Sequence, residues 1–239
     1  FHISRNFNLP TLNDRFWKNL GRPDLRPEKG YSTDISWVFR RPDYSVELTG
    51  FQLILDDWIL WQPDSTGLFM PGNLRKVWSR GVEISGSWQV YPPKPERRRG
   101  GAGGTVSRQN LSRSRFKVDL SGRLQFSKTT NVAVYGDSES VLGEQLPFTP
   151  RVSGGLSLRA SRGMFSVAYL QQFTGERLDN GGKEIESFSL GNLLASCALF
   201  DRRLTIDFRL ENLWNTQYEI IRYRPMPGSS WKLGVGFNW

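Results

Sequence analysis

The decapeptide RLTIDFRLEN, residues 203–212, alternates apolar and polar side chains. Strict alternation over this length is typical of a β-strand with one apolar and one polar face, because successive strand side chains point to opposite sides. The same period of two recurs along nearly the whole chain, and helical periodicity is almost absent. It predicts ten strands, at 1–8, 31–40, 44–61, 76–90, 114–135, 150–160, 164–175, 185–199, 203–212 and 229–239.

The connections between the predicted strands alternate in length. Tight turns at 40–43, 161–163 and 201–202 separate long polar loops at 9–30, 62–75, 136–149, 176–184 and 213–228. Long strands with short turns at one end and long loops at the other are typical of an antiparallel transmembrane β-barrel. A soluble antiparallel protein, whose apolar face is simply core, is the alternative, although its strands are usually shorter.

The two faces of strand 203–212 differ in what contact with lipid would cost. A basic side chain on the lipid side costs about 2–4 kcal/mol at the middle of the bilayer. We therefore expect Asp207, Arg209 and Glu211 to face the lumen. The aliphatic and aromatic face should meet lipid, and its residues are Leu204, Ile206, Phe208 and Leu210.

The composition argues against several classes of protein. His2 is the only histidine of the 239 residues and Cys197 the only cysteine, so a histidine-based zinc site, a Ser-His-Asp site and an internal disulfide are not expected. Catalytic serine, phosphate-binding and metal-ligand motifs are absent, which predicts neither an enzyme nor a cofactor or metal. No apolar run approaches the ~18 residues of a membrane helix.

Four segments carry more than periodicity: RNFNLPTLND at 5–14, GRPDLRPE at 21–28, GEQLPFTPR at 143–151 and ENLWNTQYEIIRYRPMPGSSWKLGVGFNW at 211–239. In this order they resemble segments of TonB-dependent outer-membrane receptors. The resemblance implies a barrel of 22 strands around an N-terminal plug, in the bacterial outer membrane. Residues 1–239 would then be the C-terminal portion of the barrel domain, although a free-standing ten-stranded barrel is the alternative.

The resemblance also implies a function for the full receptor. It would bind a scarce ligand, an iron–siderophore or vitamin B12, in its external loops and import it with proton-motive force delivered by TonB through the plug. A passive channel, or a membrane-anchored barrel that TonB does not drive, is the alternative within this fold. A soluble carbohydrate- or nucleic-acid-binding module is the alternative outside it.

Two of the long loops combine aromatic side chains with adjacent hydrogen-bonding groups, which suits a large, partly apolar ligand. The same side chains could instead only pin the loops to the barrel rim. The candidate ligand-binding residues are Asn13, Asp14, Arg15, Phe16, Trp17, Trp214 and Tyr218.

The last predicted strand ends with the chain at Trp239, where the family usually has Phe. Its alternation resembles the signal that the outer-membrane assembly machinery recognises, and the same side chains would also contact lipid. The residues expected to form this signal are Trp231, Leu233, Val235, Phe237 and Trp239.

The formal net charge of +9 is concentrated in one segment. Residues 94–117 hold eight of the 32 Lys and Arg residues against a single acid, so the charge does not indicate a nucleic-acid-binding surface. They form part of a basic, Gly- and Arg-rich insertion at 91–113, in a connection on the short-turn side, which the resemblance makes periplasmic. We interpret it as a solvated excursion, with contact to anionic partners or lipid headgroups as the alternative.

Overall fold

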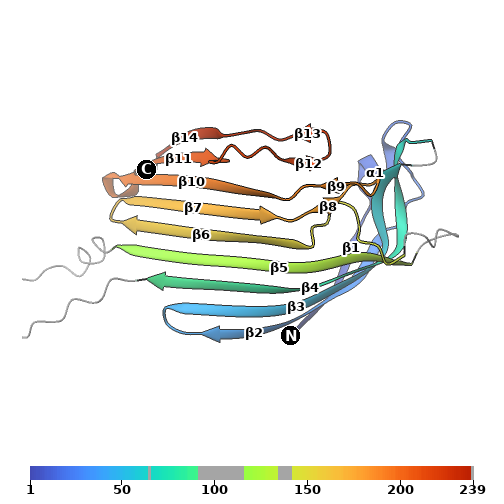
Figure 1. Cartoon of the computed structure of the whole chain (residues 1–239), viewed down its shortest axis with the longest axis horizontal. Coiled ribbons are helices and arrows are strands. Elements are labelled where there is room, and N and C mark those ends of the chain that lie inside the picture. The colour runs from blue at the N-terminus through green and yellow to red at the C-terminus, as the bar shows by residue number, and fades with distance from the viewer. Residues whose placement is uncertain (64–65, 91–115, 134–141, 238–239) are drawn as a thin grey trace, which may run out of the picture.

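The computed structural model describes residues 1–63, 66–90, 116–133 and 142–237, and one antiparallel sheet of ten strands dominates it (Figure 1). The ten strands lie in the sheet in the order of the chain, so each one hydrogen-bonds to the sheet strands that come before and after it. Their bounds are β1 (His2–Asn8), β2 (Glu28–Arg40), β3 (Tyr44–Pro63), β4 (Phe69–Val90), β5 (Lys117–Ala133), β6 (Val152–Arg162), β7 (Phe165–Thr174), β10 (Phe188–Leu199), β11 (Leu204–Glu211) and β14 (Ser230–Phe237).

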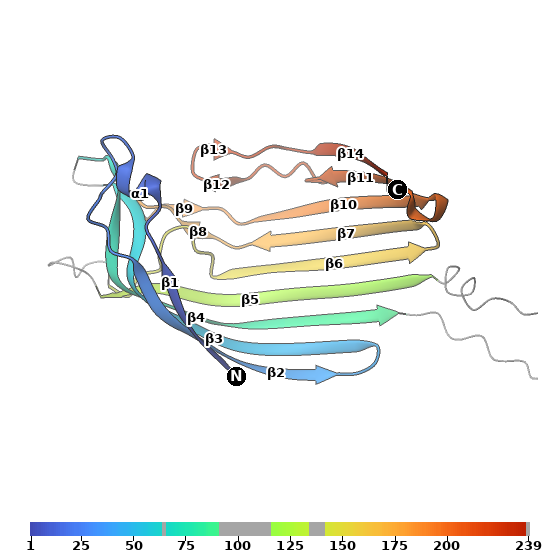
Figure 2. The same cartoon turned by 180° about the vertical axis from the view of Figure 1, so that it is seen from behind.

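The remaining elements are short and lie in the connections. The helix α1 (Leu12–Phe16) and two small hairpins, β8 (Arg177–Leu178) with β9 (Glu184–Ile185) and β12 (Glu219–Ile221) with β13 (Arg224–Pro225), all lie at the long-loop end (Figures 1 and 2). A 3₁₀ turn, Phe200–Arg202, joins β10 to β11 at the opposite end. Among the described residues, no helix is long and apolar enough to cross a membrane.

All ten predicted strands are confirmed, but the predicted loop at 62–75 is wrong. There β3 continues to Pro63 and β4 already begins at Phe69. The segment around Pro71 and Gly72 has the composition of a turn, yet β4 pairs with β3 there. Within the described residues, pairing of β4 with β5 begins at Lys76, so Pro71 lies where β4 pairs with β3 alone and a missing N–H is tolerated. The predicted basic insertion at 91–113 lies outside the described residues.

The register places the apolar positions of neighbouring strands in continuous rows on one face. Leu193 pairs with Leu210 and Leu210 with Trp231, for example. The predicted lipid-facing residues of β11 all belong to this face, which we call the outer face. Its large apolar side chains are exposed; Ile35, for example, is 62% exposed and Phe237 is 68% exposed.

A second layer does not cover the outer face. Among the described residues only five hydrophobic side chains are buried: Leu25, Val77, Leu146, Ala168 and Ile185. A sheet of this size with so small a core and so much exposed apolar surface does not suit water. Burial therefore disfavours the soluble alternative and favours lipid as the medium around the outer face.

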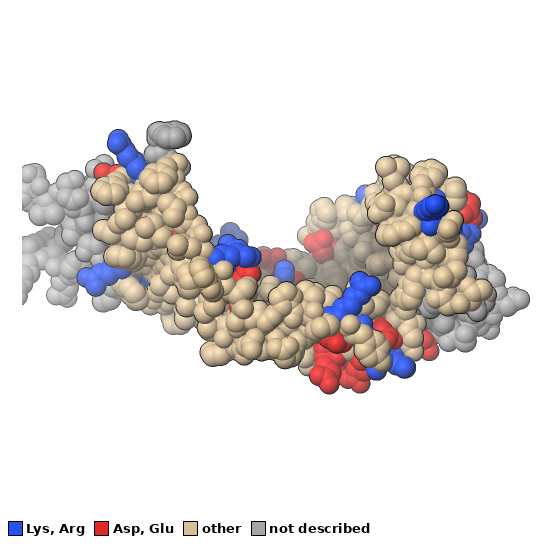
Figure 3. All heavy atoms as spheres, turned by 90° about the horizontal axis from the view of Figure 1, so that it is seen from above, with Lys and Arg blue, Asp and Glu red and all other residues tan. Residues whose placement is uncertain are grey.

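The opposite face, which we call the inner face, carries charge. Arg123 of β5 lies 4.0 Å from Glu83 of β4, and Lys232 of β14 lies 3.0 Å from Glu211 of β11. In the view onto the β14 side, blue and red side chains gather along a hollow and toward the long-loop end (Figure 3). The division of the sheet into a charged and an apolar face is the one predicted from strand 203–212.

Replacing Phe208 by Arg in the complete protein should lower the free energy of unfolding from a bilayer by about 2–4 kcal/mol, because the new charge would enter hydrocarbon at mid-strand. Urea titration in lipid vesicles measures this value. The matched control is Thr205→Arg, which adds the same side chain to the inner face of the same strand. Equal destabilisation by the two variants would contradict the assignment of the faces.

Candidate functional site

The helix α1 is fixed at its first turn by a capping box. The Thr11 side chain accepts a hydrogen bond from the Asp14 amide at 3.1 Å, and an Asp14 carboxylate oxygen accepts one from the Thr11 amide at 2.7 Å. Such reciprocal bonds satisfy two amides that a helix start would otherwise leave unpaired. The cap sets the direction in which this five-residue helix presents Phe16, which is 64% exposed.

Trp61 of β3 joins two long connections. Its indole Nε1 donates to the second oxygen of Asp14 at 2.8 Å, and its ring meets Trp17 edge to face at 6.1 Å. From the other side, the Asn180 amide donates to the Trp61 carbonyl oxygen at 3.3 Å. The segment carrying α1 and the connection between β7 and β10 are therefore held against the same strand.

Asp14 is a structural anchor. Partial burial raises its pKa, but the hydrogen bonds from Thr11 and Trp61 outweigh this and hold the pKa below the usual aspartate value. The carboxylate is therefore ionised at neutral pH, and both of its oxygens are already engaged by the chain. Its neighbour Arg15 donates to the Leu25 carbonyl at 3.4 Å, while its Nε is buried with no hydrogen-bond partner among the described residues.

A second group of side chains surrounds Arg177, which is 7% exposed. Its guanidinium donates to the Glu219 carbonyl at 3.0 Å and lies 5.1 Å from the centre of the Phe188 ring. Phe188 in turn packs against Tyr218 at 4.6 Å. Burial lowers the pKa of Arg177, although a guanidinium starts so high that it stays charged.

An ion pair joins the two small hairpins. Arg222 lies 3.8 Å from Asp179, whose carboxylate also accepts the amides of Lys183 and Gly181. These hydrogen bonds and the nearby cations lower the pKa of Asp179, so the pair is charged at neutral pH. Beside it lies a recess of about 410 Å³, whose lining includes Glu184, Glu186, Tyr218, Glu219 and Arg222.

The structure places the predicted ligand-binding residues in three different settings. Asn13, Phe16 and Trp17 are exposed on α1 and its end, while Asp14 and Arg15 bond within the protein. Tyr218 lines the recess. Trp214 lies apart: its Nε1 is 3.3 Å from the hydroxyl of Tyr169, which pairs with Leu158 and Leu193 on the outer face.

No sequence pattern points to four further residues of this end of the sheet: Trp61, Arg177, Asn180 and Arg222. Trp61 ended a predicted strand, and nothing in the local pattern signals that it bonds to residues 47 positions earlier and 119 positions later. Arg177 and Asn180 lie within the predicted loop 176–184, but their composition resembles that of any polar loop. Among the described residues, no group of three or more His, Cys, Asp and Glu is placed to hold a metal ion.

The predicted assembly signal lies in β14. Trp231, Leu233, Val235 and Phe237 are exposed and share the outer face with the apolar residues of β11, while Trp239 is outside the described residues.

Replacing Trp61 by Phe should weaken the attachment of α1 by about 1 kcal/mol, because one hydrogen bond to a partly exposed carboxylate is lost while ring packing is kept. Hydrogen exchange at the amides of Arg15 and Gly21, which bond within this segment, measures the change. Trp58→Phe, three positions earlier in β3, is the control. Unchanged protection in Trp61→Phe would rule out the anchor.

The attachment of α1 should also depend on pH. Because the pKa of Asp14 is lowered in the folded protein, its contribution is complete above the ordinary aspartate value of about 3.9 and is lost as pH falls through the folded value. Exchange protection of α1, corrected for intrinsic rates, should therefore fall in acid. Asp14→Asn should give weaker protection at neutral pH and remove this dependence, and an acid transition that survives in this variant would assign it to another group.

Comparison with known proteins identifies the family of this chain. Residues 2–213 match the family described as TonB dependent receptor-like, beta-barrel. The vitamin B12 transporter BtuB of Vibrio vulnificus (strain YJ016) is 22% identical over 234 residues, which cover 98% of this chain and 32% of that protein.

Solved structures agree on the fold. The copper transporter OprC superposes with a TM-score of 0.68 at 16% identity, over 99% of this chain and 36% of that one. The ferric citrate transporter FecA, in its unliganded form, gives 0.61 at 15% identity, over 87% and 31%. The chain thus spans about a third of the length of these proteins. It belongs to the β-barrel family of TonB-dependent receptors, which are transporters of the bacterial outer membrane and not enzymes.

Proposed function

We propose that this chain is the C-terminal portion of the barrel of a TonB-dependent receptor. The sheet order supports a larger barrel, because it begins at β1 and finishes at β14, and within the described ranges neither strand pairs along its outer edge. In hydrocarbon an open edge leaves backbone groups without partners, at a cost of several kcal/mol each. Further strands of a larger barrel, up to the family's 22, would cover both edges around an N-terminal plug.

The complete receptor imports a scarce ligand through this barrel, an iron–siderophore or vitamin B12. Energy comes from the inner-membrane proton gradient, delivered by TonB through the plug. The observation that carries this proposal is a cluster at the long-loop end. There a ring contact, hydrogen bonds and an ion pair link three connections through Trp17, Trp61, Arg177 and Arg222. The similar proteins include transporters of vitamin B12, ferric citrate and copper, and the first two support the proposed ligand classes.

In this cluster the exposed side chains would contact the ligand, and the anchored side chains would hold them in position. Phe16 and Trp17 offer aromatic surface at the long-loop end, and the recess at the same end offers polar groups, a combination that suits a large ligand with apolar and charged parts. Trp61 and Asp14 hold that surface in place before a ligand arrives, which reduces the entropy lost on binding.

The terminal strand has its own proposed role. The alternating residues of β14 would serve as the signal for the outer-membrane assembly machinery, and the same exposed side chains would contact lipid once the barrel is in place.

Replacing Trp17 by Ala in the complete receptor should weaken ligand binding about tenfold, since a large aromatic side chain at a binding surface is replaced by a methyl group. Uptake of radiolabelled cobalamin and of a panel of ferric siderophores in cells measures both the loss and the ligand. The matched control is Trp37→Ala, which removes a similarly exposed tryptophan, 61% against 53%, from the outer face of β2. Unchanged affinity for every ligand in Trp17→Ala would remove α1 from the binding site.

A further inference from the structure

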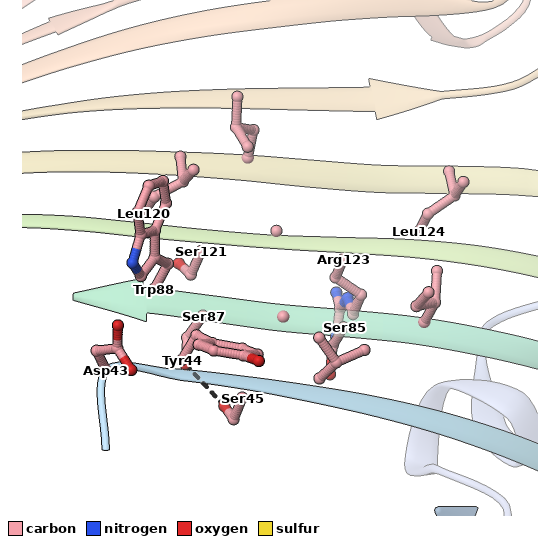
Figure 4. A pocket seen from close by; sticks show the side chains of 15 residues that line it. Asp43, Tyr44, Ser45, Ser85, Ser87, Trp88, Leu120, Ser121, Arg123 and Leu124 are labelled. Atoms are coloured by element: carbon pink, nitrogen blue, oxygen red, sulfur yellow. Dashed lines mark hydrogen bonds between the residues drawn. The ribbon is translucent and has the colours of Figure 1, made fainter. Parts of the chain in front are cut away.

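An apolar groove lies on the outer face of strands β3 to β6, close to the short turns (Figure 4). Its volume is about 710 Å³, which is within the range of small-molecule sites. Tyr44, Trp88 and Leu120 lie at the end near Asp43, and Leu124 lies at the opposite end. It is far from the long-loop cluster, and ligand import gives it no role.

Two glycines that stand side by side create the groove. Gly86 of β4 pairs with Gly122 of β5, and this pair is flanked by Val46 on β3 and Leu156 on β6. The rows on either side of this one carry large groups, with Ile84 paired to Leu124 and Trp88 paired to Leu120. Two neighbouring positions without side chains therefore leave a gap between two apolar ridges.

The backbone does not require glycine at these two positions. A Cβ atom at Gly86 would lie 3.5 Å from its nearest neighbour, the Ser45 carbonyl oxygen, and at Gly122 the nearest contacts are also at 3.5 Å. Those are ordinary contact distances. At Gly81 of the same strand, by contrast, a Cβ would lie 2.2 Å from the Phe126 carbonyl oxygen. Because glycine weakens a strand interior, the empty space itself is the feature that needs an explanation.

The position of the groove indicates its depth in the membrane. The glycine row is two residues from the Tyr44–Trp88 row, or about 7 Å along the strand, and the turn follows that row directly. Tyr44 and Trp88 are residue types that favour the interface between lipid tails and headgroups. The gap therefore lies among the acyl chains of the leaflet on the short-turn side.

An anion lies at the Asp43 end of the groove, and a cation lies close to that end. The guanidinium of Arg41 lies 5.2 Å from the centre of the Phe39 ring, which packs on Tyr44 at 5.8 Å. Asp43 lines the groove itself. A cation and an anion at headgroup depth, next to an apolar slot, match a zwitterionic lipid: a phosphate beside Arg41, an ammonium beside Asp43 and a tail in the slot.

We propose that this groove is a specific binding site for one phospholipid with a zwitterionic headgroup, such as phosphatidylethanolamine, from the leaflet on the short-turn side. One acyl chain occupies the gap above Gly86 and Gly122, and Arg41 and Asp43 hold the headgroup. The lipid fills a cavity in the outer face of the barrel wall and is not part of the transported cargo.

Native mass spectrometry of the complete receptor tests this, after detergent exchange that strips loosely held lipid and addition of phosphatidylethanolamine. The wild type should retain one lipid, and the double variant Gly86→Leu with Gly122→Leu should bind it at least about tenfold more weakly, because the side chains occupy the slot. The matched control is Gly50→Leu, a glycine of β3 that pairs with Val82 on the same face but does not line the groove. Arg41→Ala should weaken the wild-type interaction and reduce its preference for phosphatidylethanolamine over a neutral diacylglycerol.

If the leucine variant does not fold, Gly86→Ala with Gly122→Ala takes its place in the test, because the added methyl groups fit at ordinary contact distance. Ligand uptake should be unchanged in all groove variants that fold, which separates this proposal from the one for the long-loop end. Equal lipid retention by wild type and groove variants would overturn the proposal, as would equal loss in Gly50→Leu. If the groove variants lose a dimer of the receptor and not a bound lipid, the groove binds a second copy of the chain and the lipid proposal is wrong.

Discussion

The structure depends on one constraint: in hydrocarbon, every backbone N–H and C=O must find a partner within the protein. A sheet meets this demand only through unbroken pairing between neighbours, and the ten strands from β1 to β14 pair in chain order throughout. Pairing fixes the register, and the register decides which side chains share a face. The apolar outer face and the charged inner face are therefore consequences of the same hydrogen-bond ladder that allows the chain to cross the membrane.

The backbone ladder fixes the strands, so the two proposed binding sites lie at the strand ends and in the space between side chains. At the long-loop end, hydrogen bonds from Trp61 and Asn180 and the ion pair between Asp179 and Arg222 tie separate connections into one surface. Near the short turns, two glycines in one row leave a slot that a lipid tail fits. The first is built from side chains that reach across loops, and the second from side chains that are missing.

The fold was largely predictable because a strand in a membrane wall repeats a simple local rule. Alternation gave ten strands with ends within a few residues of those observed, except at 62–75, where Pro71 and Gly72 resemble a turn but lie in a hairpin that extends beyond the sheet's main body. The candidate site was predictable only in part. Of the predicted binding residues, Phe16 and Trp17 are exposed, whereas Asp14 is an internal anchor and Trp214 lies on the outer face.

The period of two, the apolar and charged faces and the resemblance to a receptor family can all be read from the sequence, because each depends on residues close together along the chain. Only the folded chain shows that Trp61 connects α1 to Asn180, that the buried Arg177 donates to the Glu219 carbonyl, and that Gly86 and Gly122 are neighbours. These contacts join residues tens of positions apart, and only the register of the paired strands brings them together. Local pattern specifies a strand and its two faces, but it carries no record of which side chain on the next strand will stand opposite.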